Sequence, residues 1–356
     1  MAAALIGAVV LGAHAAPARA ELLPFKALKA EPEAWEPGTW ARYKAAFLQP
    51  DGRIIDDANG GISHSEGQGY GMLLAVLADD RPAFDSLWLW TRSNLMKRPD
   101  GLISWRWEAD KTPNITDANN ASDGELLVAW ALLEAADRWG VAEYRRSAVA
   151  LVTALDKVAG ARSAFGRILL PGAVGFSAAD RPDGPVVNPS YWVFPAMERL
   201  KTAAPSIDWD GYRASGYTLL RNTRFGAAQL APDWVTIAGG KAAPAEGFPP
   251  RFSYNAIRIP LYLAWTARPN REALQPYVQY SGQVGETVRE YDVTTSQMTD
   301  PMGGAGYAAI LALAKCAFDG TKLPLGLRSV SLDRYYPSTL HMLSLAAARL
   351  RFGTCW

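Results

Sequence analysis

Apolar residues recur at helical spacing along most of this chain, and strictly alternating stretches are rare. Two of the helices are expected to begin with S-x-x-E/Q capping boxes, formed by Ser65 with Gln68 and by Ser122 with Glu125. The periodicity predicts ten to twelve helices: one near 35–48, then 65–79, 81–96, 122–139, 142–159, 189–203, 209–224, 255–267, 305–318 and 338–351.

Strand signals are confined to two short stretches. Residues 102–116 and 167–176 are the best strand or hairpin candidates, because Ile103 to Trp107 alternates apolar and polar side chains. The intervening loops are rich in Gly, Pro, Asn and Asp, and no low-complexity linker divides the chain. We therefore expect one all-α domain over residues 21–356, decorated by short β-hairpins.

The first twenty residues have the composition of an export signal. An apolar stretch runs from Ala2 to Ala13, and Ala18-Arg19-Ala20 has the A-x-A pattern of a cleavage site. No Lys or Arg precedes the stretch, so the true start codon lies upstream or the signal is atypical. Residues 1–20 are thus predicted to be a signal peptide. The mature protein is expected to be periplasmic or secreted, with no membrane insertion after cleavage.

Composition narrows the function classes. The chain of 356 residues has a formal net charge of +1, which gives no field that would attract nucleic acid. Three histidines and two cysteines make a metal site unexpected, and Cys316 and Cys355 leave a disulfide open. No cofactor is implied. The 13 Trp and 14 Tyr residues suit either core packing or a cleft that stacks on sugar rings.

Three segments each place chemistry-bearing side chains at a predicted helix start: 64–71, 119–125 and 252–258. In a barrel of antiparallel helix pairs, the inner helices begin at the same end, so the three segments could converge on one cleft. Acids in a first helical turn also complement the helix dipole without any catalytic role. The glycines Gly67, Gly69 and Gly71, which would let the backbone approach a ligand, favour the functional interpretation.

These segments resemble motifs of glycoside hydrolase family 8. Ser-Glu-Gly-Gln-Gly-Tyr-Gly at 65–71 looks like that family's proton-donor motif, and Ala-Ser-Asp-Gly-Glu at 121–125 is similar to its second signature, although Glu125 stands where the family usually has Asp. Asn-Pro-Ser-Tyr at 188–191 and Tyr-Tyr at 335–336 also look like cleft segments. The resemblance implies an (α/α)6 barrel, an inverting mechanism with Glu66 as the acid, and Asp123 in the centre of the cleft. A monomer is expected.

One motif departs from the family pattern. Many members have the catalytic base as Asp in Tyr-Asp-Ala-x-Arg, whereas this chain has Asn255 in that place. An amide takes no proton from water, so three readings stay open. The base lies elsewhere, with Asp292, Asp300 and Asp117 as candidates; or Asn255 positions water while Asp123 takes the proton; or the protein is a weak hydrolase that binds glucan.

The motifs also suggest how substrate would be bound. Candidates for sugar contacts are Asn255, Tyr254, Arg258, Tyr191, Trp107 and Tyr335. The acids do not cluster beyond the motifs, so a β-1,4-glucan polysaccharide is favoured over the cationic chitosan, and xylan is the further alternative. Two other classes compete: a non-catalytic glucan-binding periplasmic protein, and a polysaccharide lyase, which would need an Arg/Lys-rich cleft.

Overall fold

The computed structural model describes residues 34–356 except residue 286, so the predicted signal peptide lies outside the described residues. Eleven α-helices account for most of the ordered secondary structure there. Their bounds are α1 Thr39–Phe47, α2 Ser65–Leu77, α3 Arg81–Asn94, α4 Ser122–Trp139, α5 Ala142–Ala159, α6 Phe194–Ala203, α7 Trp209–Asn222, α8 Arg258–Trp265, α9 Arg271–Val284, α10 Ala305–Asp319 and α11 Tyr335–Arg351.

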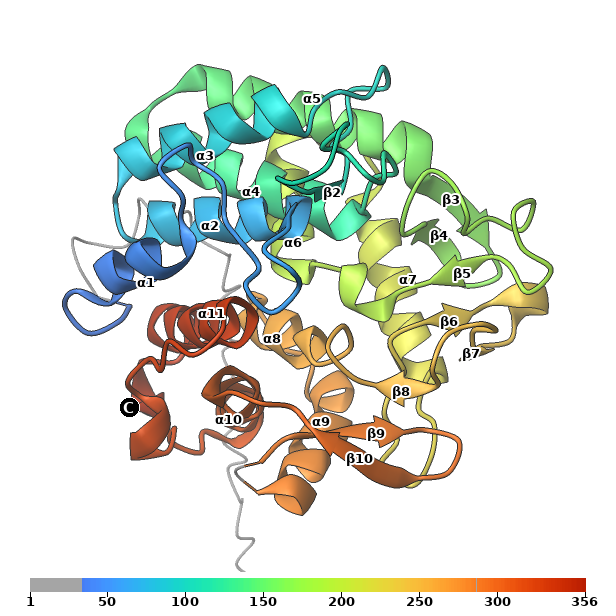
Figure 1. Cartoon of the computed structure of the whole chain (residues 1–356). Helices are drawn as coiled ribbons and strands as arrows, with labels where there is room; N and C mark the ends of the chain where they lie inside the picture. The colour runs from blue at the N-terminus through green and yellow to red at the C-terminus, as the bar shows by residue number, and fades with distance from the viewer. Residues whose placement is uncertain (1–33, 286) are drawn as a thin grey trace, which may run out of the picture.

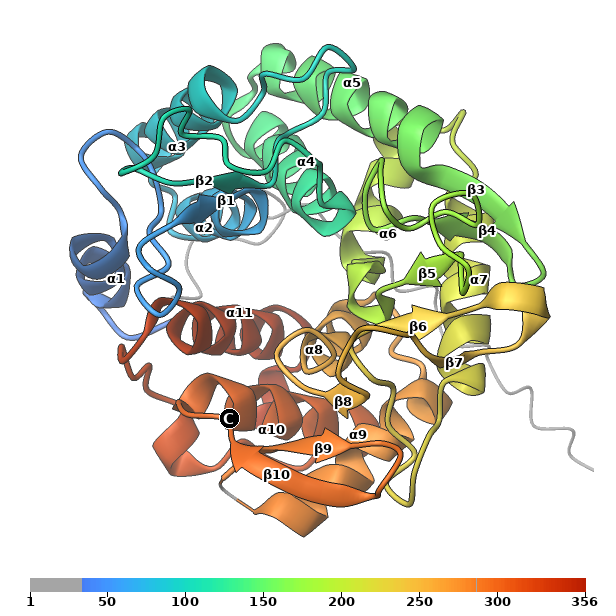
Figure 2. The ribbon, with the colours of Figure 1, turned by 45° about the vertical axis from the view of Figure 1, so that its right-hand side comes forward.

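The helices form a ring of packed pairs, the (α/α)6 barrel that was predicted (Figure 2). Helices α2, α4, α8 and α11 are buried over most of their lengths, and the buried residues include polar side chains such as Ser122 and Ser338 as well as the apolar ones. In contrast, α3, α5, α7 and α9 bury a single face and turn charged residues to solvent. The buried apolar side chains form one cluster from Ala34 to Cys355, as a single domain requires.

Short antiparallel strands decorate one end of the ring (Figures 1 and 2). They form the pair β1–β2, the hairpin β3–β4 and the three-stranded sheets β5-β6-β7 and β10-β9-β8. Their bounds are β1 Ser63–His64, β2 Arg106–Trp107, β3 Gly160–Ser163, β4 Gly166–Leu169, β5 Val186–Val187, β6 Val235–Thr236, β7 Ala243–Pro244, β8 Arg251–Phe252, β9 Arg289–Asp292 and β10 Gln297–Pro301. The predicted decoration by hairpins is confirmed.

Both predicted capping boxes are wrong, although the helices that they were expected to begin, α2 and α4, are present. The ring of His64, not Ser65, caps α2, since its Nδ1 accepts the Gly67 N–H at 3.0 Å. The Gln68 side chain instead accepts from Ile54 N, 14 residues earlier in the chain. Ser122 donates to the Leu170 carbonyl, so tertiary contacts have taken up the polar groups that a local cap would use.

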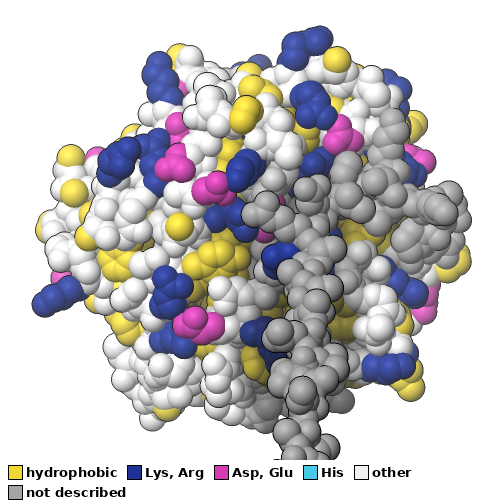
Figure 3. Space-filling view, turned by 180° about the vertical axis from the view of Figure 1, so that it is seen from behind, with side chains coloured by type: hydrophobic (Ala, Val, Ile, Leu, Met, Phe, Trp, Pro, Cys, Tyr) yellow, Lys and Arg dark blue, Asp and Glu magenta, His cyan; other side chains and the backbone are white. Residues whose placement is uncertain are grey.

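The face seen from behind carries Lys, Arg, Asp and Glu side chains interspersed with one another (Figure 3). No helix among the described residues combines the length and apolar character needed to cross a bilayer. The disulfide left open by the sequence is present: Cys316 on α10 pairs with Cys355, with their Cα atoms 6.0 Å apart. It ties the chain's last residues to α10.

Candidate active site

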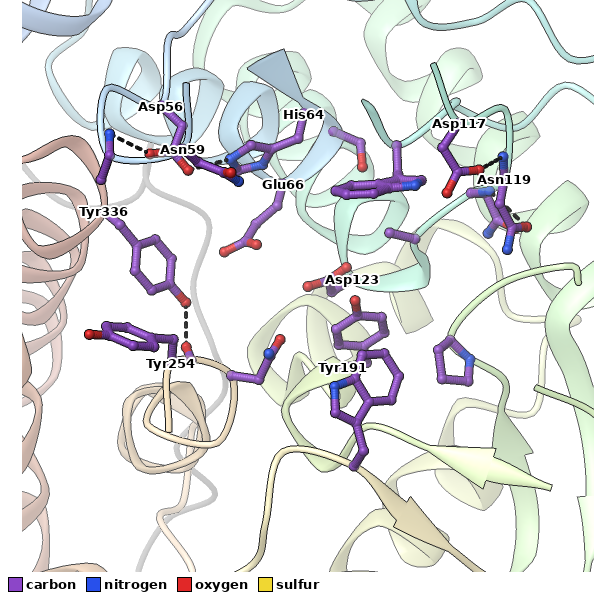
Figure 4. A pocket seen from close by; sticks show the side chains of 18 of the residues that line it. Asp56, Asn59, His64, Glu66, Asp117, Asn119, Asp123, Tyr191, Tyr254 and Tyr336 are labelled. Carbon is purple, nitrogen blue, oxygen red and sulfur yellow. Dashed lines mark hydrogen bonds and ion pairs between the residues drawn. The ribbon is translucent and has the colours of Figure 1, made fainter. Parts of the chain in front are cut away.

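An open cavity of about 840 Å³ lies at the end of the ring that carries the strands. Residues from distant parts of the chain line it, and Figure 4 shows Glu66, Asp123 and Tyr191 facing it. The lining comprises Asp56, Ala58, Asn59, His64, Ser65, Glu66, Trp105, Asp117, Asn119, Asn120, Ala121, Asp123, Pro171, Phe176, Tyr191, Trp234, Tyr254, Asn255, Gly303, Tyr307, Arg334, Tyr336 and Pro337. Polar groups thus converge on a cleft with many rings, as in sites for small or chain-like ligands.

Glu66 lies in the first turn of α2 and reaches the cavity from the ring's inner wall. Burial raises the pKa of its carboxyl above the ordinary value; the Arg258 guanidinium opposes this rise, and the charge of Asp123 adds to it. A carboxyl that holds its proton in a cleft is suited to donate that proton to a leaving oxygen.

Asp123, in the first turn of α4, is 1% exposed. Its Oδ2 accepts from Arg258 Nη1 at 2.6 Å, and its Oδ1 accepts from the Gly124 N–H at 2.9 Å. Both carboxylate oxygens therefore have donors, which fixes the orientation of the group in the centre of the cavity wall.

The Arg258 guanidinium joins the segments that the sequence analysis expected to converge. Its Nη1 lies 3.1 Å from Glu66 Oε1 and 2.6 Å from Asp123 Oδ2, and its Nη2 donates to Ser190 Oγ and to Asn255 Oδ1. Since both acids contact one nitrogen, their two oxygens are less than about 6 Å apart. Arg258 is 1% exposed and does not line the cavity, so it orders the carboxylates from behind and does not grip a sugar directly.

Two of the three glycines of the first motif, Gly69 and Gly71, serve packing and not ligand approach. A Cβ on Gly69 would lie 2.6 Å from the Leu127 Cβ of α4, and one on Gly71 would lie 2.8 Å from the Ile54 side chain. On the facing helix, a Cβ on Gly124 would meet Ser65. The missing side chains let α2 and α4 approach until Glu66 and Asp123 share Arg258.

Glu125, the second acid of its motif, points away from the cavity and is fully buried. It accepts from the backbone N–H of Ile103 at 3.0 Å and from Asn120 Nδ2 at 3.1 Å. Burial raises its pKa to about 8. Its role is to hold the loops before α4 and β2, which form part of the cleft wall.

Asn255, the departure from the family motif, lines the cavity. Of the three acids that the sequence offered as replacement bases, only Asp117 is in the lining. The carboxylate of Asp292 closes its own hairpin turn by accepting from Thr294 and Thr295, and that of Asp300 is 76% exposed beside Arg251.

The predicted sugar-binding rings divide into two groups. Tyr191 and Tyr254 line the cavity, and the exposed ring of Tyr254 is available for stacking. Tyr335 is fully buried between Phe47 and His64, so its ring has no face to offer a sugar. Its neighbour Tyr336 lines the cavity instead and donates to the Tyr254 carbonyl at 2.8 Å.

Trp107, the remaining ring predicted to bind sugar, lies outside the cavity lining. Its indole packs edge-on against Trp90, with the Arg53 guanidinium 5.1 Å from the ring centre. These contacts make it part of the wall behind the cleft, and the lining Trp residues are Trp105 and Trp234.

Two functional features escaped sequence reasoning. The first is the pair of His64 and Asp56, whose Nε2 and Oδ2 atoms lie 3.5 Å apart in the cavity wall beside Glu66. Burial lowers the pKa of His64, but Asp56 and Glu66 outweigh it and leave that pKa raised. The second is Asp233, next to Asn255. Within the described ranges, no group of three or more His, Cys, Asp or Glu side chains is arranged to hold a metal ion.

A ring of helix pairs with two closely spaced acids in an aromatic-lined groove defines a carbohydrate-cleaving enzyme, and comparison with known proteins identifies the family. The sequence model of the family "Glycosyl hydrolases family 8" matches residues 21–349 of this chain. The chain belongs to this family.

Several proteins similar to this chain are named endoglucanases. An endoglucanase of Cellulomonas uda is 43% identical, over 69% of this chain and 68% of its own length, and a probable endoglucanase of Novacetimonas hansenii is 37% identical over 78% and 80%. The crystal structure of a family 8 endoglucanase from Klebsiella pneumoniae has a TM-score of 0.79 at 38% identity, covering 88% of this chain and 99% of that one. An endo-β-1,4-glucanase structure from Acetobacter xylinum gives 0.80 at 34% identity, covering 88% and 97%.

Proposed function

We propose that this glycoside hydrolase cuts internal β-1,4 bonds of a cellulose-like glucan with inversion, using Glu66 as the general acid. The relatives named endoglucanases support the reaction and substrate. The observation that carries the residue assignment is the raised pKa of the Glu66 carboxyl, which faces the cavity within 3.1 Å of Arg258.

The surroundings of Glu66 suit both halves of a proton transfer. Before the reaction, burial and the charge of Asp123 favour the protonated form of the carboxyl by raising its pKa. When the proton moves to the leaving glycosidic oxygen, Glu66 becomes an anion, and the Arg258 guanidinium at 3.1 Å stabilises it. The same contact thus lowers the cost of the product state without removing the proton beforehand.

Asp123 is assigned to holding and polarising the sugar at the cleavage point, not to taking a proton. Its oxygen lies less than about 6 Å from that of Glu66, whereas an inverting pair stands roughly 6.5–9.5 Å apart to leave room for water. Both of its oxygens already accept hydrogen bonds, from Arg258 and from the Gly124 N–H, so fewer of its lone pairs are available for attack or for a water proton.

The test measures reducing sugar released from carboxymethylcellulose by the wild type and by Glu66→Gln, with chitosan and xylan run in parallel. We expect glucan to be the best substrate, and the variant to lose about 10²- to 10⁴-fold in kcat while its KM changes little. A wild type that binds cello-oligosaccharides without cleaving any of the three polymers would establish a glucan-binding protein instead. A preference for chitosan or xylan would replace the substrate assignment.

We further propose that the enzyme acts outside the cytoplasm, in the periplasm or after secretion. The support is the A-x-A pattern that ends at Ala20 and the pairing of Cys316 with Cys355, which an oxidising compartment permits. N-terminal sequencing of the protein recovered from a periplasmic or culture fraction tests this, with a chain beginning at Glu21 expected.

A further inference from the structure

Asn255 is held in a fixed orientation by a charged group on either side. Its Oδ1 accepts from Arg258 Nη2 at 2.9 Å, and its Nδ2 points at Asp233 Oδ2, 3.4 Å away. Because Asn and Asp have the same shape, the Nδ2 atom occupies the place of a carboxylate oxygen in family members with Asp here. The negative charge absent from position 255 is therefore present one contact further back.

Asp233 is built into this wall of the cleft. It is partly buried and lies behind the cavity lining, which its chain neighbour Trp234 and its contact partner Asn255 both join. Its Oδ1 accepts from the backbone N–H groups of Ser253 at 3.1 Å and Ala256 at 2.7 Å. Oδ2 has only the long contact to the Asn255 amide among the hydrogen bonds of the described residues, so it keeps a lone pair that another donor could use.

We propose that Asp233 is the general base of the reaction, acting on a water molecule held by the Asn255 amide. The inference rests on the proposed hydrolase function. As the water oxygen bonds to the anomeric carbon, one water O–H bond breaks and its proton passes to Asp233 Oδ2. The bond from the anomeric carbon to the leaving oxygen breaks in the same step, and that oxygen takes the proton of Glu66.

The position of Asp233 within the fold agrees with this role. An inverting base must face the sugar from the side opposite the acid. Asp233 belongs to the segment that pairs with β8, whereas Glu66 follows β1, and Figures 1 and 2 both place β8 and α2 on different sides of the ring. Burial raises the pKa of Asp233 to about 6, which makes it a stronger proton acceptor than an ordinary aspartate.

The other acids fit less well. The backbone of Asp117 forms an isolated antiparallel β-bridge with Arg106 of β2. Strand β2 pairs with β1, and β1 leads directly into Glu66. Asp117 therefore lies in the wall that already supplies the acid. The same holds for Asp56, which is paired with His64 of β1. Among the hydrogen bonds of the described residues, neither carboxylate contacts the Asn255 amide, whereas that of Asp233 does.

The experiment compares wild type, Asp233→Asn, Asn255→Asp and the double variant on carboxymethylcellulose, with full pH profiles. Asp233→Asn retains an oxygen that accepts from both backbone amides, so it removes the charge but keeps the turn. Asp208→Asn is the matched control, because Asp208 also accepts a backbone N–H, from Gly211, at the far helix α7. Binding of cellohexaose is measured for every variant.

We expect Asp233→Asn to lose about 10²- to 10⁴-fold in kcat, with cellohexaose binding retained and the fall in activity below pH 6 abolished. The double variant, which returns a carboxylate to position 255, should recover activity with a new acidic limb. Should Asp233→Asn fail to fold, Asn255→Asp decides, because a second carboxylate 3.4 Å from Asp233 should move the acidic limb to higher pH.

Near-wild-type kcat in Asp233→Asn, or an acidic limb that persists there, would overturn the proposal. An acidic limb of the pH profile that stays at the same pH in Asn255→Asp would also overturn it. An inactive wild type would instead refute the proposed function, so the two failures are distinguishable. A loss of cellohexaose binding with unchanged kcat would mark Asp233 as a wall residue only.

Discussion

Replacing Arg258 by Met would test whether one buried cation is the counter-charge that stabilises both cleft acids. The guanidinium is 1% exposed and makes four polar side-chain contacts, to Glu66, Asp123, Ser190 and Asn255. Met fills similar space but leaves the carboxylates without a counter-charge. Removing one partner of a buried ion pair costs about 3–5 kcal/mol in the free energy of unfolding. In a protein of this size, that corresponds to a melting temperature lowered by about 4–7 °C.

The loss of stability caused by Arg258→Met should depend on pH in a definite direction. Without Arg258, the pKa of Glu66 is expected to rise further, because the guanidinium lowers it more than His64 or Tyr70 does. A carboxyl whose pKa is higher in the folded than in the unfolded state favours folding at low pH and loses that contribution as pH rises. The stability difference between wild type and Arg258→Met should therefore narrow as pH falls from 7 toward 4.5, the ordinary value for Glu.

The assay is urea unfolding followed by tryptophan fluorescence across this pH range. Arg199→Met is the matched control, since Arg199 is 5% exposed and pairs with Glu134 at 2.6 Å and Asp137 at 2.7 Å, neither of which lines the cavity. Both variants should lose stability, and only Arg258→Met should change the pH profile of kcat. A gap between Arg258→Met and wild type that stays constant with pH would refute the electrostatic reasoning and leave packing as the cause.

Three further predictions concern neighbouring groups. Asp123→Asn should lower the pKa of Glu66, because the Asp123 charge raises it; a carboxyl titration by NMR with an unmoved midpoint would contradict this. Glu125→Gln should fold well, and wild type should lose stability relative to it as pH rises from 4.5 to about 8, which thermal melts at several pH values would measure. Gly69→Ala should cost about 1–3 kcal/mol by overpacking against α4, while Gly282→Ala, with open space around its Cβ, should leave stability equal or slightly higher in the same melts.

Helix periodicity predicted the architecture well, because the barrel is built from helices whose burial follows the sequence pattern. The ranges 122–139 and 142–159 match α4 and α5, where long apolar faces are separated at Gly140, in the left-handed conformation that ends α4. Helix α9 was missed. It contains Pro276 and polar residues through much of its length, so its periodic signal is weak. Strands of two residues, such as β1 and β5, are too short to show alternation.

The site was only partly accessible from the sequence. Glu66 and Asp123 stand in motifs, so their importance could be inferred before their geometry was known. Asp233 stands in no motif, and its closeness to Asn255 arises from pairing between segments about twenty residues apart. Trp107 was assigned from residue type and Tyr335 from a motif of two adjacent tyrosines, and neither signal tells a ring that faces the cleft from a buried one.

The glycines between α2 and α4 have a consequence for how this enzyme could diverge. Gly69 and Gly124 fix the separation of two helices, and each helix carries one cleft acid in its first turn. The spacing of Glu66 and Asp123 is therefore inherited from backbone contact and does not depend on loop conformation. Loops around the cleft are free to vary and change which polymer is accepted, while the distance between the two acids stays constant as long as both positions remain glycine.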